Sequence, residues 1–60
     1  MNQIKVILDE QGRSQVWLSR QVGKSYLTVT NYCNNKRQPS LSTLGKIAGI
    51  LDVDIRDLLT

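Results

Sequence analysis

The chain has 60 residues, a formal net charge of +3, one cysteine (Cys33) and no histidine. A domain of this length buries only about 60% of the surface of its unfolded chain, so it leaves little room for a deep catalytic pocket. A Cys/His zinc site needs four ligands and is excluded, and we expect no other metal or cofactor. Apolar runs are too short for a membrane span or a signal peptide, so we expect a cytoplasmic protein with a reduced thiol.

The charges are unevenly distributed along the chain. The acidic residues lie near its ends: Asp9, Glu10, Asp52, Asp54 and Asp57. Residues 11–51 contain no carboxylate but carry these cations: Arg13, Arg20, Lys24, Lys36, Arg37 and Lys46. A stretch of one sign favours a polyanionic partner such as nucleic acid, because each phosphate contact releases condensed counterions. A solubilising basic surface, or a site for acidic proteins or lipids, would explain the same charges.

Helical periodicity begins near the N-terminus. A helix over residues 2–11 is predicted by apolar residues at helical spacing: Ile4, Ile7 and Leu8. It ends at Gly12, since glycine readily adopts the left-handed conformation common just past a helix. Ser14 is a good N-cap for a second helix over 15–22, which Gly23 ends.

A third helix follows almost immediately. Ser25 can cap a helix over about 26–34, with Val29 and Tyr32 on one side. The side chains left facing outward are Tyr26, Leu27, Thr28, Thr30 and Asn31. This arrangement leaves a mostly polar face without a partner in the chain.

The second half of the chain contains a loop and two more helices. Residues 34–39 are polar and basic and end in the only proline, so they form a loop. Ser40 caps a fourth helix over 41–51. A last helix over 55–59 follows Asp54, which forms a capping box with the carboxylate three residues later. Without β-type alternation, we expect a single all-α domain.

The second and third helices have the spacing of a helix-turn-helix. Their tight turn needs a residue without a Cβ, and Gly23 supplies it. The small Ser19 lies four residues earlier and faces the turn, while the branched Val29 anchors the next helix six residues later.

Three segments in order resemble the phage-repressor/Cro-type regulators, often called XRE-like. They are residues 15–25 (QVWLSRQVGKS), 39–48 (PSLSTLGKIA) and 51–59 (LDVDIRDLL), and the resemblance runs from Ile4 to Leu59. It implies a compact five-helix, lambda-repressor-like domain over residues 1–60. It further implies that the third helix lies in the major groove of double-stranded DNA.

The resemblance also implies which residues contact DNA. Those at base-facing positions are Ser25, Tyr26, Leu27 and Asn31, with Thr28 and Thr30 beside them. Those at phosphate-facing positions are Gln15, Asn34 and Lys36, with Asn35 between the last two and Arg37 added by charge and proximity. The chemistry agrees, because Asn can pair bidentately with adenine, hydroxyls bond several base edges, and apolar groups contact thymine methyls.

Several residues also have plainer interpretations. Asn31 can be an ordinary solvated helix residue, and Tyr26 and Leu27, where the family often has Gln, Asn or Thr, can be partly buried. We favour Trp17 packing over the core beside the first or fourth helix, although an aromatic there could also anchor a dimer. Cys33 is expected to be a small, half-buried residue.

The sequence therefore predicts a transcriptional regulator of a prokaryote or phage, acting on the nucleoid. It would bind double-stranded DNA sequence-specifically as a homodimer on a pseudo-palindromic operator. An adaptor or antitoxin-type interaction module is the alternative, with Val6, Val16 and Trp17 as its apolar face. An enzyme is disfavoured by the lack of a nucleophile–base pair, and RNA binding by the lack of paired aromatics on a sheet.

Overall fold

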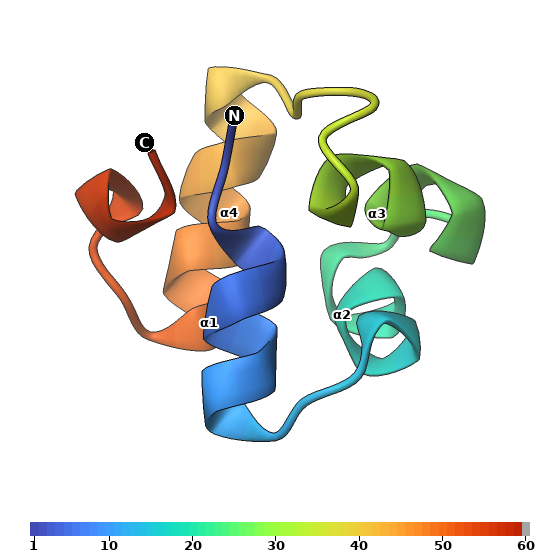
Figure 1. Cartoon of the computed structure of the whole chain (residues 1–60), viewed down its shortest axis with the longest axis horizontal. Coiled ribbons are helices and arrows are strands. Elements are labelled where there is room, and N and C mark those ends of the chain that lie inside the picture. The colour runs from blue at the N-terminus through green and yellow to red at the C-terminus, as the bar shows by residue number, and fades with distance from the viewer. Residues whose placement is uncertain (60) are drawn as a thin grey trace.

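Four α-helices and a closing 3-10 helix form the protein in the computed structural model, which describes residues 1–59 (Figure 1). In chain order they are α1 (Ile4–Gln11), α2 (Gln15–Val22), α3 (Tyr26–Cys33), α4 (Leu41–Leu51) and η1 (Ile55–Leu58). The predicted all-α class and the helix-turn-helix of α2 and α3 are confirmed. None of these helices has the length and apolar character that crossing a bilayer requires.

The helix ends follow the predicted capping signals. A serine immediately precedes each of α2, α3 and α4, and its hydroxyl accepts a hydrogen bond from an N–H group of the first turn. The distances are 3.0 Å for Ser14, 3.1 Å for Ser25 and 3.2 Å for Ser40. Gly12 and Gly23 end α1 and α2 in the left-handed conformation, with φ of 67° and 73°. These local bonds satisfy backbone groups that the helices leave unpaired at their termini.

Three predicted boundaries differ from the structure. α1 begins at Ile4 instead of residue 2, because Asn2 is held in an isolated antiparallel bridge with Leu59. α3 ends one residue early, with Asn34 as its C-cap. The last element is a 3-10 helix of four residues instead of an α-helix over 55–59, since so short a segment favours i→i+3 bonds and Leu59 is extended.

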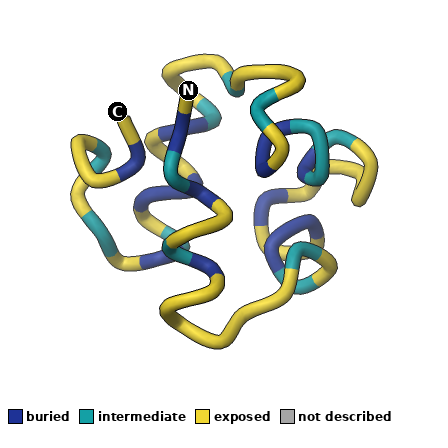
Figure 2. Tube along the Cα trace, viewed as in Figure 1, coloured by how far each residue is buried: buried dark blue, intermediate teal, exposed yellow. Residues whose placement is uncertain are grey.

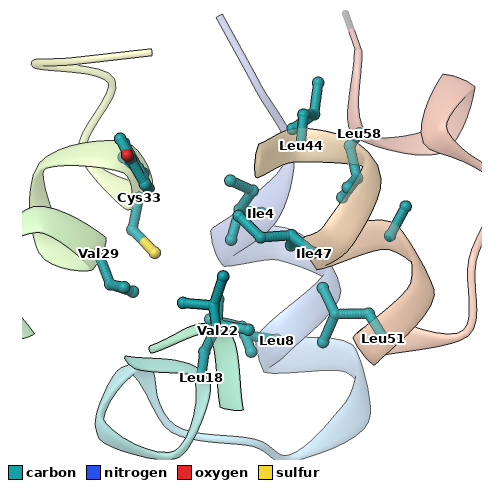
Figure 3. Close-up of a cluster of buried hydrophobic side chains, with 12 residues drawn as sticks. Ile4, Leu8, Leu18, Val22, Val29, Cys33, Leu44, Ile47, Leu51 and Leu58 are labelled. Carbon is teal, nitrogen blue, oxygen red and sulfur yellow. The ribbon is translucent and has the colours of Figure 1, made fainter. Parts of the chain in front are cut away.

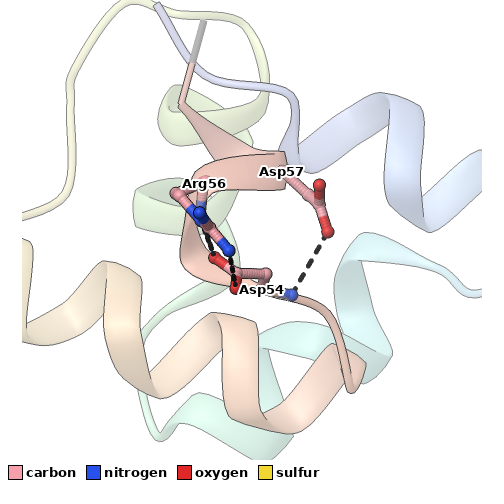
Figure 4. A network of polar contacts seen from close by, with 3 residues as sticks. All are labelled: Asp54, Arg56 and Asp57. Atoms are coloured by element: carbon pink, nitrogen blue, oxygen red, sulfur yellow. Dashed lines mark hydrogen bonds and ion pairs between the residues drawn. The ribbon is translucent and has the colours of Figure 1, made fainter.

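A capping box begins η1 (Figure 4). The backbone N–H of Asp54 donates to Asp57 Oδ2 at 3.2 Å, while Asp54 Oδ1 accepts from the Arg56 backbone N–H at 2.9 Å. The Arg56 guanidinium also donates to both oxygens of Asp54 at 3.0 Å. These bonds lower the pKa of the Asp54 carboxyl below its usual value. Both side chains are well exposed, so the ion pair itself adds little stability.

One apolar core joins all five elements (Figures 2 and 3). It consists of Ile4, Leu8, Leu18, Val22, Val29, Tyr32, Cys33, Leu44, Ile47, Ala48, Leu51 and Leu58. Trp17 is half-buried and packs against this core, as the favoured interpretation holds. Cys33 is only 5% exposed, so the expectation of a half-buried residue is wrong, and burial raises the pKa of its thiol.

We predict that truncating the centre of α4 destabilises the protein strongly. Ile47 is completely buried, so Ile47→Ala should lower the free energy of unfolding by about 2–5 kcal/mol through lost burial and a cavity. Leu41→Ala is the matched control in the same helix, because Leu41 is 71% exposed and should change stability by less than about 0.5 kcal/mol. Urea unfolding followed by Trp17 fluorescence measures both. Equal losses in the two variants would contradict the core described here.

Candidate nucleic-acid interface

The corner between α2 and α3 determines the orientation of α3 relative to α2. Gly23 and Lys24 both donate backbone N–H groups to the carbonyl oxygen of Ser19, at 3.0 and 3.1 Å. Ser19 is buried and its hydroxyl donates to the Val16 carbonyl at 2.7 Å, so its polar group is satisfied inside the corner. Val29 is fully buried on the far side of the turn. The predicted left-handed glycine at the turn and the buried anchor Val29 are confirmed.

The outward face of α3 carries the residues predicted to contact bases. Tyr26 and Leu27 are the most accessible large side chains there, at 54% and 68% exposed. Ser25 is also exposed, whereas Thr28, Thr30 and Asn31 are half-buried. The structure therefore places three of the six in the open at the start of α3, and the other three are partly covered along the helix.

Two of these hydroxyls bond each other at the start of α3. Ser25 Oγ accepts from the Thr28 backbone N–H at 3.1 Å and donates its proton to Thr28 Oγ1 at 2.9 Å. Its proton and one acceptor site are thus used within the helix cap. The hydroxyl proton of Thr28 stays available, so Thr28 is better placed than Ser25 to donate to a base or phosphate.

A hydrogen bond between side chains joins α3 to the beginning of α2. Thr30 Oγ1 donates to Gln15 Oε1 at 3.0 Å, so Thr30, a predicted base contact, orients Gln15, a predicted phosphate contact. The bond occupies the acceptor of the Gln15 amide and leaves its NH₂ group to donate outward. Gln15 is the first residue of α2, where backbone N–H groups also favour an anion.

The loop after α3 presents two cations on a well-ordered backbone. Lys36 and Arg37 are exposed, and their backbone N–H groups donate to the carbonyl of Asn31 at 3.0 and 3.2 Å. Asn35 donates its N–H to the Tyr32 carbonyl at 3.2 Å and has a left-handed φ of 58°. This is the Schellman pattern with asparagine in the usual place of glycine. The exposed C-cap Asn34 precedes it.

Asn35 differs from the other predicted phosphate contacts. Its Oδ1 accepts from the backbone N–H of Asn2 at 2.8 Å and from Gln38 Nε2 at 3.1 Å. The side chain is half-buried and engaged inside the protein. Asn35 therefore shapes the loop that carries the neighbouring cations.

The carboxylates lie outside α3 and the loop that follows it. Figure 1 shows η1, which carries Arg56 and Asp57, on the opposite side of the molecule from α3. The remaining acidic residues lie in α1 (Asp9, Glu10) and immediately before η1 (Asp52, Asp54). The accessible face of α3 and the loop after it hold no carboxylate, so a polyanion meets no fixed negative charge on these elements.

Two cations have structural contacts that the sequence did not indicate. Lys46 Nζ donates to the Val22 carbonyl at 3.2 Å, at the C-terminal end of α2 where the helix dipole favours a positive charge. The guanidinium carbon of Arg13 lies 4.1 Å from the centre of the Trp17 ring, a cation–π contact. The first joins α4 to α2, the second is local to the start of α2, and neither was predicted.

Comparison with known proteins places this geometry among helix-turn-helix proteins. A family model described as "Helix-turn-helix" matches residues 4–58. The chain is also similar to the crystal structure of "a putative DNA-binding protein from Bacteroides fragilis", with 50% sequence identity and a TM-score of 0.94. That match covers 97% of this chain and 94% of the other. No curated protein matches the chain.

We predict that adding a methyl group has opposite effects at two glycines. Gly23→Ala should destabilise the protein by about 1–2 kcal/mol, because an alanine is strained at a φ of 73°. Gly49→Ala, in the last turn of α4, should stabilise it by up to about 1 kcal/mol, since a Cβ there meets no atom within 4 Å. Chemical denaturation of the two variants and the parent protein gives both values. If Gly23→Ala leaves the free energy of unfolding unchanged, the corner does not require a glycine at this left-handed position.

Proposed function

Because this chain belongs to the helix-turn-helix family of the XRE type, we propose that it binds double-stranded DNA sequence-specifically, with α3 in the major groove. One observation carries the proposal: Gln15, the first residue of α2, lies beside α3 at Thr30, and two exposed cations, Lys36 and Arg37, follow α3 in a loop without a carboxylate. Phosphate contacts beside a groove-reading helix fix its register and orientation on the duplex. The activity proposed is binding, not catalysis.

Base recognition on this proposal is shared between hydrogen bonds and apolar contact. Asn31 can pair with an adenine edge, and Thr28 can donate its hydroxyl proton. Tyr26 and Leu27 are the most exposed large hydrophobic side chains of α3 and suit thymine methyl groups or the sugar–phosphate backbone. Few side chains here form bidentate contacts, so sequence-dependent DNA shape contributes to recognition.

A homodimer on a pseudo-palindromic operator is the assembly we propose. The monomer measures only 24 × 22 × 17 Å, so a single copy covers little DNA. Two copies would place their recognition helices about 34 Å apart, one turn of the double helix. Such a protein regulates transcription and acts where the chromosome lies, in the cytoplasm.

An adaptor that binds another protein is the second candidate, because Val6 and Val16 are exposed apolar residues. Trp17 is less available to such a surface, because it packs against the core and the Arg13 guanidinium lies over its ring. Equilibrium sedimentation with and without DNA separates the two functions. A stable complex with a protein partner and no affinity for DNA at low salt would favour the adaptor.

We predict that Asn31→Ala relaxes the preference for one base in each half-site. The lost discrimination should be about 1–3 kcal/mol at that position, the value of a good bidentate contact. Selection of bound duplexes from a random pool, with parent and variant in parallel, measures it. Asn34→Ala is the control, because losing a phosphate contact weakens binding to all sequences alike. An unchanged base preference in Asn31→Ala would remove its assigned role.

We predict that Lys36→Ala reduces the salt dependence of binding. The slope of log K against log salt concentration should fall in magnitude by about 1, because one fewer phosphate is neutralised. Arg56→Ala removes the same charge from η1, on the other side of the molecule, and should leave the slope unchanged. Titrations of a selected duplex at several salt concentrations give both slopes. Equal slopes for Lys36→Ala and the parent would exclude the phosphate contact.

A further inference from the structure

The segment before α1 is bonded to the end of α3. Asn2 is only 6% exposed, although it is polar and close to the N-terminus. Its Nδ2 donates to the Tyr32 carbonyl at 2.9 Å and to Gln38 Oε1 at 3.0 Å, and its Oδ1 accepts from the Ile4 N–H at 3.0 Å. Its backbone N–H donates to Asn35 Oδ1 at 2.8 Å. Both donors of the amide are thereby used within the protein.

The two loop residues whose side chains bond to Asn2 flank the two exposed cations in the sequence. Asn35 and Gln38 lie immediately on either side of Lys36 and Arg37, and Gln38 Nε2 donates to Asn35 Oδ1 at 3.1 Å. Asn2, Asn35 and Gln38 therefore form a closed set of hydrogen bonds across the base of the loop. The loop has no regular secondary structure, so this set and the bonds to the Asn31 carbonyl fix its path.

Asn2 is itself held firmly from the opposite side. Gln3 donates its backbone N–H to the Leu58 carbonyl at 3.0 Å, and Asn2 forms an antiparallel bridge with Leu59. The segment thus lies between the end of η1 and the end of α3. Within residues 1–59 no buried side-chain nitrogen or oxygen lacks a partner, so the amide gains these bonds without leaving another polar group unsatisfied.

We propose that Asn2 is a positioning residue for DNA binding, which fixes the loop so that Lys36 and Arg37 meet the phosphates in a preorganised conformation. This inference rests on the proposed function. Asn2 is too buried to contact DNA itself, so its effect passes through the loop. Ordering the loop in the free protein removes an entropic cost that binding would otherwise carry.

Asn2→Ser tests this with the least disturbance. Serine keeps the backbone N–H and a short oxygen that can accept from Ile4, but it lacks the NH₂ group that reaches Tyr32 and Gln38. We expect affinity for a selected duplex to fall about tenfold. The slope of log K against log salt concentration should shrink by up to about 2, as two phosphate contacts weaken.

Hydrogen exchange supplies a readout that does not depend on DNA. In Asn2→Ser the amides of Lys36 and Arg37, which donate to Asn31, should exchange faster than in the parent protein. The amide of Ile47, in the middle of α4 and completely buried, should keep its protection and so reports on the fold as a whole. A purely structural role for Asn2 would change both sets of amides together.

Gln38→Ala is the second variant, and Gln21→Ala is its control. Gln38 is exposed and outside the core, so its loss breaks two bonds of the closed set without unfolding the protein. Gln21 is an exposed glutamine on α2 for which no change is expected. Gln38→Ala should flatten the salt slope and speed loop exchange in the same direction as Asn2→Ser.

The outcomes separate this inference from the proposed function. Parental salt slopes and parental loop protection in Asn2→Ser and Gln38→Ala, with the parent binding DNA, would overturn the role of Asn2 alone. If Asn2→Ser does not fold, Gln38→Ala decides by the same two measurements. A parent protein that binds no duplex at low salt would overturn the proposed function, and the inference with it.

Discussion

The orientation of α3 depends on two backbone hydrogen bonds at the carbonyl of Ser19. Gly23 and Lys24 both donate to that oxygen, and Lys24 can reach it because Gly23 adopts a left-handed conformation and turns the chain back toward the end of α2. Ser19 itself is buried, and Ser25 starts α3 at once. Each contact proposed with DNA follows from this corner, since it determines that Val29 faces the core and the polar side of α3 faces outward.

The other end of α3 is fixed by bonds from elsewhere in the chain. The carbonyl of Asn31 accepts from Lys36 and Arg37, so the residue proposed to read a base and the cations proposed to hold phosphate share one hydrogen-bonded unit. A thin core cannot extend under this loop, and polar side chains take its place. Asn2 and Asn35 supply them. As a result α3 is anchored by α2 at its start and by the segment before α1 at its end.

Local signals in the sequence predicted most of the fold. Serine caps, terminal glycines and helical periodicity act within a few residues, and the bounds of α2 and α4 were predicted to the residue. The 3-10 geometry of η1 was missed because a capping box marks where a helix starts and not how tightly it winds. The contacts that the sequence did not indicate join residues that no spacing relates: Lys46 with Val22, Thr30 with Gln15, and Asn2 with Tyr32, Asn35 and Gln38.

These hydrogen bonds divide the residues expected at the interface into two groups. Ser25 and Asn35 use polar atoms to hold the ends of α3, and Thr30 uses its proton to orient Gln15. On the proposed function, hydrogen bonds to bases then come mainly from Thr28 and Asn31, while the apolar start of α3 contributes methyl contacts and sensitivity to DNA shape. With few directional base contacts, such a protein depends more on its phosphate contacts for affinity and register. An ordered loop after α3 therefore matters more for this protein than for one whose recognition helix is rich in amide and guanidinium groups.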